Sequence, residues 1–204
     1  MEAFNQFEAI GIPIDIPNCD TDQIIPARLL RYLPEDGGYD RYLFHDLRFD
    51  GEGNEKPDFI FNQAPFRDGK IIVADINWGC GSSRENAVYA LVANGIRCVV
   101  APSFGDIHRN NCMKHGVLPV MLPTDVCEAM RARLHREPGS TLSVDLETQT
   151  VRGPDGATHA FDIQPFDKYR LQNGLDEIGI TDEYRSDVER YEAAHFEEYS
   201  WMSR

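Results

Sequence analysis

The chain has 204 residues, of which 42% are hydrophobic, and 34 acidic against 20 basic residues give a net charge of −14. This predicts a folded domain with a real core, and the negative field excludes nucleic acid and anionic membrane surfaces as favoured partners. Five scattered cysteines without a Cys-x-x-Cys pair argue against a disulfide framework and a structural zinc site. Without a signal-peptide pattern or an apolar run of about 18 residues, we expect a soluble, cytoplasmic protein.

The first elements in chain order are strands and loops. The stretch "FEAIGIPIDIPNCDTDQIIPARLL" alternates β-branched runs with Pro, Asn and Asp, which predicts strand and loop rather than helix. "PEDGGYD" and "FDGEGNEKP" are Gly-rich and acidic, so we expect exposed loops around a short ordered link. "GKIIVADINW" is the best candidate for a buried strand, because its β-branched run is bounded by turn signals.

The middle of the chain alternates helix and strand. "SSRENAVYALVANG" carries helix signals, since Ser82 with Glu85 forms a capping-box pattern and Gly95 stands where a C-terminal cap belongs. "IRCVVAPS" reads as the next strand, and "FGDIHRNNCMKHG" with "VLPVML" repeats the alternation. Strand, helix and strand in succession predict parallel strands joined by right-handed crossovers, and therefore an α/β fold.

The last third of the chain contains a helix, a hairpin and an acidic tail. "TDVCEAMRARLHRE" predicts a helix, and "TLSVDLETQTVRGPDGATHAFDI" predicts two strands around "GPDG". From Asp176 to Glu198 nine acidic residues face two basic ones, which favours a solvated helix over a partner-binding tail. We expect a main domain over residues 1–170, with residues 171–204 as a helical extension packed on it.

The junction "WGCGSSREN" at residues 78–86 lacks the common glycine-rich signatures. A dinucleotide fingerprint would need a third glycine at position 84, which is Arg84. The lysine of a P-loop and the Gly-x-Ser-x-Gly elbow of α/β-hydrolases are missing too. Cys80 has no recognisable Cys-His signature, so packing is favoured over a nucleophilic role.

The junction has physical properties that favour an acidic ligand. Backbone N–H groups at a helix N-terminus attract anions, and Gly79 and Gly81 permit close approach to the main chain. Arg84 can hold a carboxylate in a bidentate fork, and Ser82 and Ser83 add hydroxyls. The pattern indicates a small carboxylic acid and base chemistry on it. From these residues alone, Ser82 as a simple N-cap and Arg84 as a surface cation stay open.

Three motifs in the same order carry a family resemblance. "DTDQIIPARLL", "GCGSSREN" and "APSFGDIHRNNCMKHGVLPV" resemble the small-subunit family of 3-isopropylmalate dehydratase, the isopropylmalate isomerase of leucine biosynthesis and a relative of aconitase. The similarity runs from about Phe4 to about Ala193 and includes "FDIQPFDKYRLQNGLDEIGIT". It implies a swivelling β/β/α domain like the aconitase C-terminal domain, with an appended C-terminal helical segment.

The resemblance also implies a partner and a reaction. The domain would close over a separate large subunit that carries a 4Fe-4S cluster, and this chain would hold no metal. The reaction removes water from 2-isopropylmalate and adds it back to give 3-isopropylmalate. One iron acts as a Lewis acid on the departing hydroxyl, while a base takes the carbon-bound proton.

Site roles follow from the matching motif positions. The resemblance implies that Ser82 is the catalytic base and that Ser83 and Arg84 bind substrate, with Arg31 reading the substrate from a loop at Leu29 to Tyr32. Supporting roles fall on the remaining motif residues, Asp20, Thr21, Asp22, Gln23, Gly79, Gly81, Glu85, Asn86 and His108. A turn is an equal interpretation of the Asp-Thr-Asp segment, and a structural histidine is favoured over a catalytic one for His108.

One residue departs from the family pattern. Asn86 stands where the family usually has His, and an amide donates and accepts hydrogen bonds but does not take up a proton. This leaves open a paralogous hydro-lyase acting on 2-methylmalate/citraconate, dimethylmalate or homoaconitate. A non-catalytic interaction or regulatory subunit is the alternative from another class.

Overall fold

The computed structural model describes residues 1–32, 34–81 and 84–202. Within these ranges seven strands form one sheet in the order β4-β3-β2-β1-β5-β6-β7. The strands are β1 (Gln6–Ile14), β2 (Ile71–Ala74), β3 (Cys98–Ala101), β4 (Leu118–Met121), β5 (Thr141–Asp145), β6 (Thr150–Arg152) and β7 (Thr158–Ala160). The α-helices are α1 (Thr21–Ile24), α2 (His45–Arg48), α3 (Glu85–Ala93), α4 (Asp106–Lys114), α5 (Thr124–Arg136), α6 (Pro165–Asn173), α7 (Glu177–Asp182) and α8 (Arg185–Glu198). The predicted α/β class is confirmed.

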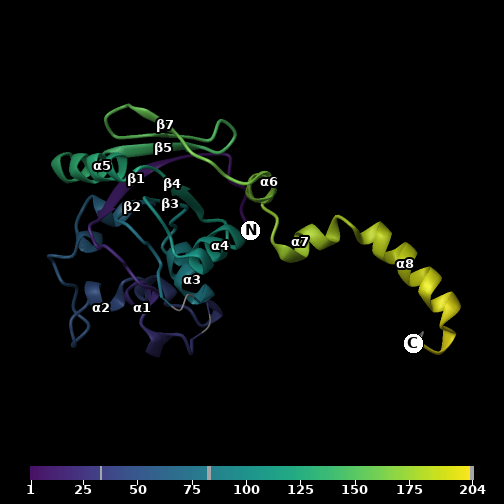
Figure 1. Cartoon of the computed structure of the whole chain (residues 1–204). Helices are drawn as coiled ribbons and strands as arrows, with labels where there is room; N and C mark the ends of the chain where they lie inside the picture. The colour runs from purple at the N-terminus through teal and green to yellow at the C-terminus, as the bar shows by residue number, and fades with distance from the viewer. Residues whose placement is uncertain (33, 82–83, 203–204) are drawn as a thin grey trace.

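The four parallel strands are the centre of the core. β1 pairs with β2, β2 with β3 and β3 with β4, all parallel. Alternate residues of β2 enter two different clusters: Ile72 packs with α3, and Ile71 packs with α5 and β5. Because side chains alternate across a strand, helices on both faces bury the whole of β2 (Figure 1).

The antiparallel part of the sheet differs from the expected two strands. β5 pairs with the first half of β1, and β6 pairs with both β5 and β7. The predicted hairpin around "GPDG" is the β6–β7 pair, but the run before it is broken into β5 and β6. Gln149 has a φ of 54°, and Asp145 accepts a hydrogen bond from the Thr148 amide at 2.9 Å. This second tight turn has no glycine or proline, so the sequence pattern did not reveal it.

The start of α3 also differs from the prediction. Arg84, with a φ of −119° and a ψ of 154°, is the N-cap, and its side chain makes no capping hydrogen bond. The predicted capping box involves Ser82, which lies outside the described residues. The C-terminal prediction is confirmed, since Gly95 follows the C-cap Asn94 with a φ of 72°.

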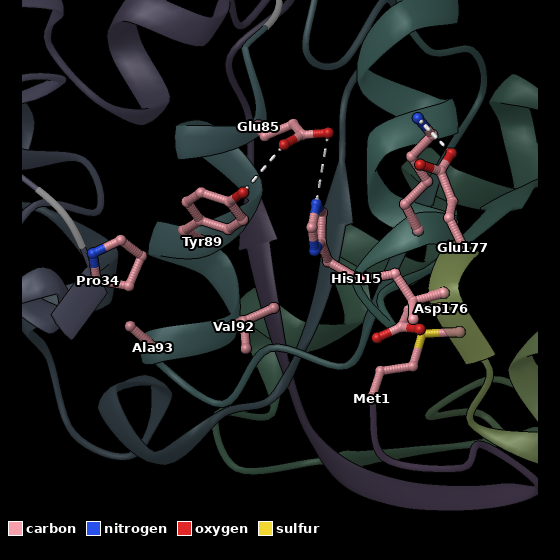
Figure 2. Close-up of a pocket in the computed structure, with 11 residues that line it drawn as sticks. Met1, Pro34, Glu85, Tyr89, Val92, Ala93, His115, Asp176 and Glu177 are labelled. Carbon is pink, nitrogen blue, oxygen red and sulfur yellow. Dashed lines mark hydrogen bonds and ion pairs between the residues drawn. The ribbon is translucent and has the colours of Figure 1, made fainter. Parts of the chain in front are cut away.

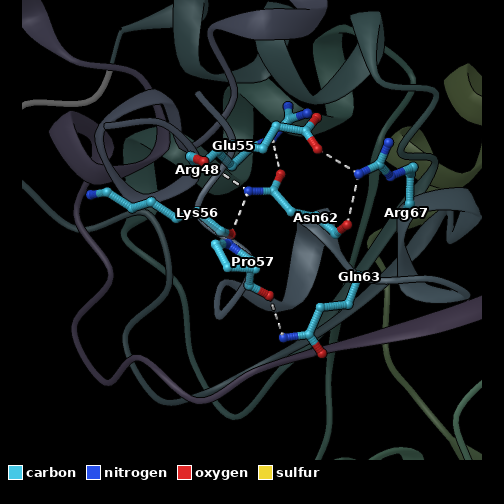
Figure 3. Close-up of polar contacts among 7 residues, drawn as sticks. All are labelled: Arg48, Glu55, Lys56, Pro57, Asn62, Gln63 and Arg67. Carbon is cyan, nitrogen blue, oxygen red and sulfur yellow. Dashed lines mark hydrogen bonds and ion pairs between the residues drawn. The ribbon is translucent and has the colours of Figure 1, made fainter. Parts of the chain in front are cut away.

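The long connection between β1 and β2 is held by side chains rather than by regular structure. Asn62 is buried and donates from Nδ2 to the carbonyls of Arg48 at 2.7 Å and Lys56 at 3.0 Å. Asn62 also accepts two hydrogen bonds (Figure 3). Arg48 donates to its side-chain oxygen at 3.1 Å, and Arg67 donates to its backbone carbonyl at 2.7 Å. Asn62, through its side chain and its backbone carbonyl, thus ties three segments of the predicted loop region together.

The C-terminal part is helical, as predicted. Its helices differ in their contacts with the rest of the protein. Leu171 of α6 is buried, and Glu177 at the start of α7 pairs with Lys114 of α4 at 2.8 Å. α8 buries none of its residues and leads away from the body (Figure 1). The expected packing of residues 171–204 on the main domain stays a prediction. In the described part of the chain, no helix is both long and apolar enough to cross a membrane.

Candidate active site

The carboxyl ends of β1, β2 and β3 bring the three sequence motifs together. Single bridges prolong the parallel pairing beyond the regular strands, joining Asp20 to Cys80 and Trp78 to Phe104. The Gly79 amide donates to the Cys19 carbonyl at 2.8 Å, and the Thr21 amide donates to the Cys80 carbonyl at 3.1 Å. Ligands of open parallel sheets bind at this edge, so the motifs lie where the topology places a site.

A small cavity of about 70 Å³ lies between α1, the turn after it and the start of α3. Its lining consists of Thr21, Asp22, Ile25, Ala27, Leu30, Arg84 and Ala87. Three of these side chains are polar or charged, and the other four are apolar. The cavity therefore offers both charged and hydrocarbon groups to a ligand.

Arg84 is the positive group of this cavity. It is exposed and stands at the N-terminus of α3, and its side chain makes no hydrogen bond or ion pair with the residues that the structure describes. The positive end of the helix dipole adds to its charge. A guanidinium in this position is available to a carboxylate ligand. Ser82 and Ser83, the predicted base and its neighbour, lie outside the described residues.

The Asp-Thr-Asp segment divides into structural and cavity-lining residues. Asp20 caps α1 by accepting from the Gln23 amide at 2.8 Å, and Gln23 returns the contact by accepting from the Asp20 amide at 2.9 Å. This reciprocal pair rigidifies the turn. Thr21 and Asp22 line the cavity instead, with Thr21 buried and Asp22 exposed. Both interpretations of the segment thus apply, to different residues.

The two glycines of the junction have different surroundings. Gly79 has a φ of 69°, and a Cβ there would overlap the His108 ring. The missing side chain thus makes room for His108, which fills the space on that side of the Gly79 backbone. The predicted approach of a ligand at Gly79 stays a prediction. Gly81 has a φ of 85° and open space around it, with the Asp20 side chain 3.6 Å from a Cβ position. At Gly81 a ligand can therefore approach the main chain closely.

His108 is fully buried beneath the junction. No described residue bonds to either ring nitrogen, and burial lowers the pKa of His108 to about 4. The imidazole is therefore neutral at physiological pH and packs against Gly79. This geometry fits a structural support for the junction rather than an acid or base in the cavity.

Glu85 faces away from the small cavity. Its carboxylate accepts from the Tyr89 hydroxyl at 3.0 Å and lies 3.8 Å from Nε2 of His115. These side chains line a separate open groove of about 570 Å³ between α3, α4 and the start of α7 (Figure 2). Burial lowers the pKa of His115, against a smaller raising effect of Glu85. Although this groove is larger, residues of the first two motifs, Thr21, Asp22 and Arg84 among them, line the small cavity.

Arg31 lies on the rim of the site rather than in the cavity lining. It is exposed, donates to the Tyr32 hydroxyl at 2.8 Å and holds its guanidinium 4.9 Å from the centre of the Tyr32 ring. Its neighbour Leu30 reaches the cavity. The predicted substrate-reading loop therefore contacts the cavity through the apolar Leu30, and the role of Arg31 in reading the substrate stays a prediction.

The cysteines show no sign of nucleophilic chemistry. Burial raises the pKa of Cys19 to about 12 and that of Cys127 to about 11, and it also raises those of Cys98 and Cys112. Cys80 points its thiol at the Asn18 carbonyl, 3.3 Å away. Within residues 1–32, 34–81 and 84–202, no group of three or more His, Cys, Asp or Glu side chains could hold a metal ion.

Comparison with known proteins identifies the family. The Aconitase C-terminal domain model matches residues 1–125, and the LeuD_N model matches residues 128–165. The chain is 45% identical over 204 residues to the 3-isopropylmalate dehydratase small subunit of Gluconacetobacter diazotrophicus, covering 100% of this chain and 98% of the relative. This chain belongs to the 3-isopropylmalate dehydratase small-subunit family. The family member from Dinoroseobacter shibae is 43% identical over 202 residues and covers 99% of this chain and 100% of its own.

A solved structure supports the fold of this family. The crystal structure of 3-isopropylmalate dehydratase (LeuD) from Methanocaldococcus jannaschii aligns with a TM-score of 0.66 at 22% identity, over 91% of this chain and 99% of the other. Together with the aconitase-domain match, this confirms the expected aconitase-like swivelling fold. At this identity the likeness carries the fold and not the site.

Sequence reasoning missed the apolar side of the cavity. Ile25, Ala27 and Ala87 reach it from α1, from the turn after α1 and from the first turn of α3. Ala87 had a signal, because it lies three residues after Arg84 and such residues share a helix face. Ile25 and Ala27 had none, since an apolar residue beside a turn is usually core.

Proposed function

We propose that this chain is the small subunit of a 3-isopropylmalate dehydratase, which isomerises 2-isopropylmalate to 3-isopropylmalate by dehydration and rehydration in leucine biosynthesis. The observation that carries the proposal is Arg84, whose side chain is unpaired among the described residues, in a cavity lined by both polar and apolar side chains. A branched malate has carboxylates for the polar side chains and an alkyl group for the apolar ones. Family membership supports the reaction class.

The roles of this chain's residues follow from that arrangement. Arg84 binds a substrate carboxylate in a bidentate fork, with Ser83 beside it in sequence. Ser82 removes the carbon-bound proton and returns it during rehydration, as a general base and then a general acid. Thr21 supplies a hydroxyl at the cavity wall, and Leu30 packs against the alkyl group.

The remaining half of the site would come from a partner. We place the 4Fe-4S cluster on a large subunit, because four of this chain's five cysteines are buried with raised thiol pKa values and so do not offer thiolate ligands. The cluster, when bound there, supplies Lewis-acid activation of the departing hydroxyl. The assembled enzyme would work in the cytoplasm.

The test is kinetics of the purified small subunit combined with its large subunit. Arg84→Lys keeps the charge but removes the fork, so kcat/KM should fall about 30- to 1000-fold. Ser82→Ala should abolish proton transfer. Arg133→Lys is the matched control, because Arg133 lies on α5 and pairs with Glu137 at 2.7 Å. Unchanged turnover in both Arg84→Lys and Ser82→Ala would refute the proposal, as would a strong preference for 2-methylmalate.

A further inference from the structure

Asn86 links the start of α3 to a distant turn. Its Nδ2 donates to the hydroxyl of Tyr39 at 2.7 Å, although 47 residues separate the two. Tyr39 is buried and begins the 3-10 helix Tyr39–Arg41. Its hydroxyl in turn donates to the backbone carbonyl of Tyr32 at 3.3 Å. A path of two hydrogen bonds therefore runs from α3 to the end of the loop that follows α1.

Aromatic rings form a second path between the same elements. The Tyr39 ring lies edge-on to Tyr89 of α3 at 6.4 Å between centroids and to Tyr42 at 5.0 Å. Tyr42 in turn contacts Tyr32 at 5.7 Å. Such ring pairs hold preferred angles as well as distances. Tyr39 thus lies at the centre of both paths.

Residues close in sequence to each end of these paths line the small cavity. At one end, Arg84 and Ala87 flank Asn86 on α3, and both line the cavity. At the other end, Tyr32 is two residues from Leu30, which also lines the cavity. The Arg31 guanidinium on the Tyr32 ring adds a further restraint on this loop. The connection therefore joins two of the segments that line the cavity, the start of α3 and the loop at residues 29–32.

We propose that Asn86 and Tyr39 are positioning residues that fix the Leu30 wall relative to Arg84, and so determine which alkyl group the cavity accepts. The proposal rests on the proposed function. An amide suits this task because it donates without a change of charge. A shift of the wall changes contacts with the substrate alkyl group, whereas the carboxylate stays on Arg84.

Asn94 offers a control of the same residue type on the same helix. Its Nδ2 donates to the Asp40 carbonyl at 3.0 Å, so it also joins α3 to the Tyr39–Arg41 turn. It lies eight residues further along α3, about 12 Å away, and bonds no residue of the loop at positions 29–32. A merely structural role for Asn86 would make the two substitutions equivalent.

The experiment uses the assembled enzyme with 2-isopropylmalate and 2-methylmalate as substrates. In Asn86→Ala and Tyr39→Phe, the ratio of kcat/KM for the isopropyl over the methyl substrate should fall about 5- to 20-fold. In the double variant the ratio should be no lower than in either single variant, because both substitutions interrupt the same path of hydrogen bonds. Asn86→His should restore the ratio, since an imidazole N–H can donate. Asn94→Ala should lower thermal stability without changing the ratio.

Two results would overturn the inference while leaving the proposed function intact. One is an unchanged ratio in Asn86→Ala and Tyr39→Phe with active wild type, and the other is an equal change in Asn94→Ala. A wild-type enzyme that converts neither substrate would overturn the proposed function and the inference together.

Discussion

The substitution His108→Met should make the free energy of unfolding fall less steeply as the pH is lowered. The imidazole is fully buried and bonds to no described residue, so methionine of similar volume removes no hydrogen bond seen in the described chain. Burial lowers the pKa of His108 from its usual 6.5 to about 4. In the unfolded chain the ring takes up a proton near pH 6.5, while the folded protein resists until about pH 4. The contribution of His108 to the free energy of unfolding is therefore fully present above about pH 6.5 and is lost as the pH falls toward 4.

The size of the effect follows from the two pKa values. Each tenfold difference in proton affinity corresponds to about 1.4 kcal/mol, so full protonation of His108 costs the folded state about 3 kcal/mol. About 2 kcal/mol of this is already lost at pH 5. Carboxylates also titrate in this range, but they are the same in wild type and variant. The difference between the two proteins isolates the histidine.

Urea unfolding at pH 5, 6, 7 and 8 provides the measurement. The free energy of unfolding of wild type should fall between pH 8 and pH 5 by about 2 kcal/mol more than that of His108→Met. His195→Gln, on the exposed helix α8, is the control for a histidine that contributes nothing to the core. Parallel pH dependences of wild type and His108→Met would refute the assignment of His108 as a buried neutral ring.

Three further predictions concern stability. Gly79→Ala should lower the free energy of unfolding by about 2–4 kcal/mol, because its Cβ would overlap His108. Gly81→Ala, in open space, should lower it by about 1 kcal/mol. Equal losses in the two variants would contradict this assignment. Arg131→Leu should cost about 2–4 kcal/mol by urea unfolding, since its buried side chain bonds the Ala74 carbonyl and pairs with Asp75. Removing residues 184–204 should shift the thermal midpoint by less than about 2 °C, because α8 buries none of its residues; a larger drop would show that the tail supports the body.

Local patterns were sufficient for most of the fold. The uninterrupted β-branched run before Trp78 predicted β2, and the alternation that follows predicted β3, α4 and β4. These features depend on neighbours within a few residues, through side-chain periodicity and turn chemistry. The turn between β5 and β6 escaped because it contains no glycine or proline, and its backbone is held by the pairing of the strands on either side.

The sequence by itself determined the kinds of groups in the site and their approximate location. Arg84 beside two serines, at the end of a buried strand, already predicted a site for an acidic ligand. Tertiary structure decided which residues share the cavity: Leu30 enters it, Glu85 turns away, and Gly79 accommodates His108. It also assigned Asn86 its partner Tyr39. These contacts join segments tens of residues apart, so they depend on the order of the strands and the path of the loops, which no local pattern records.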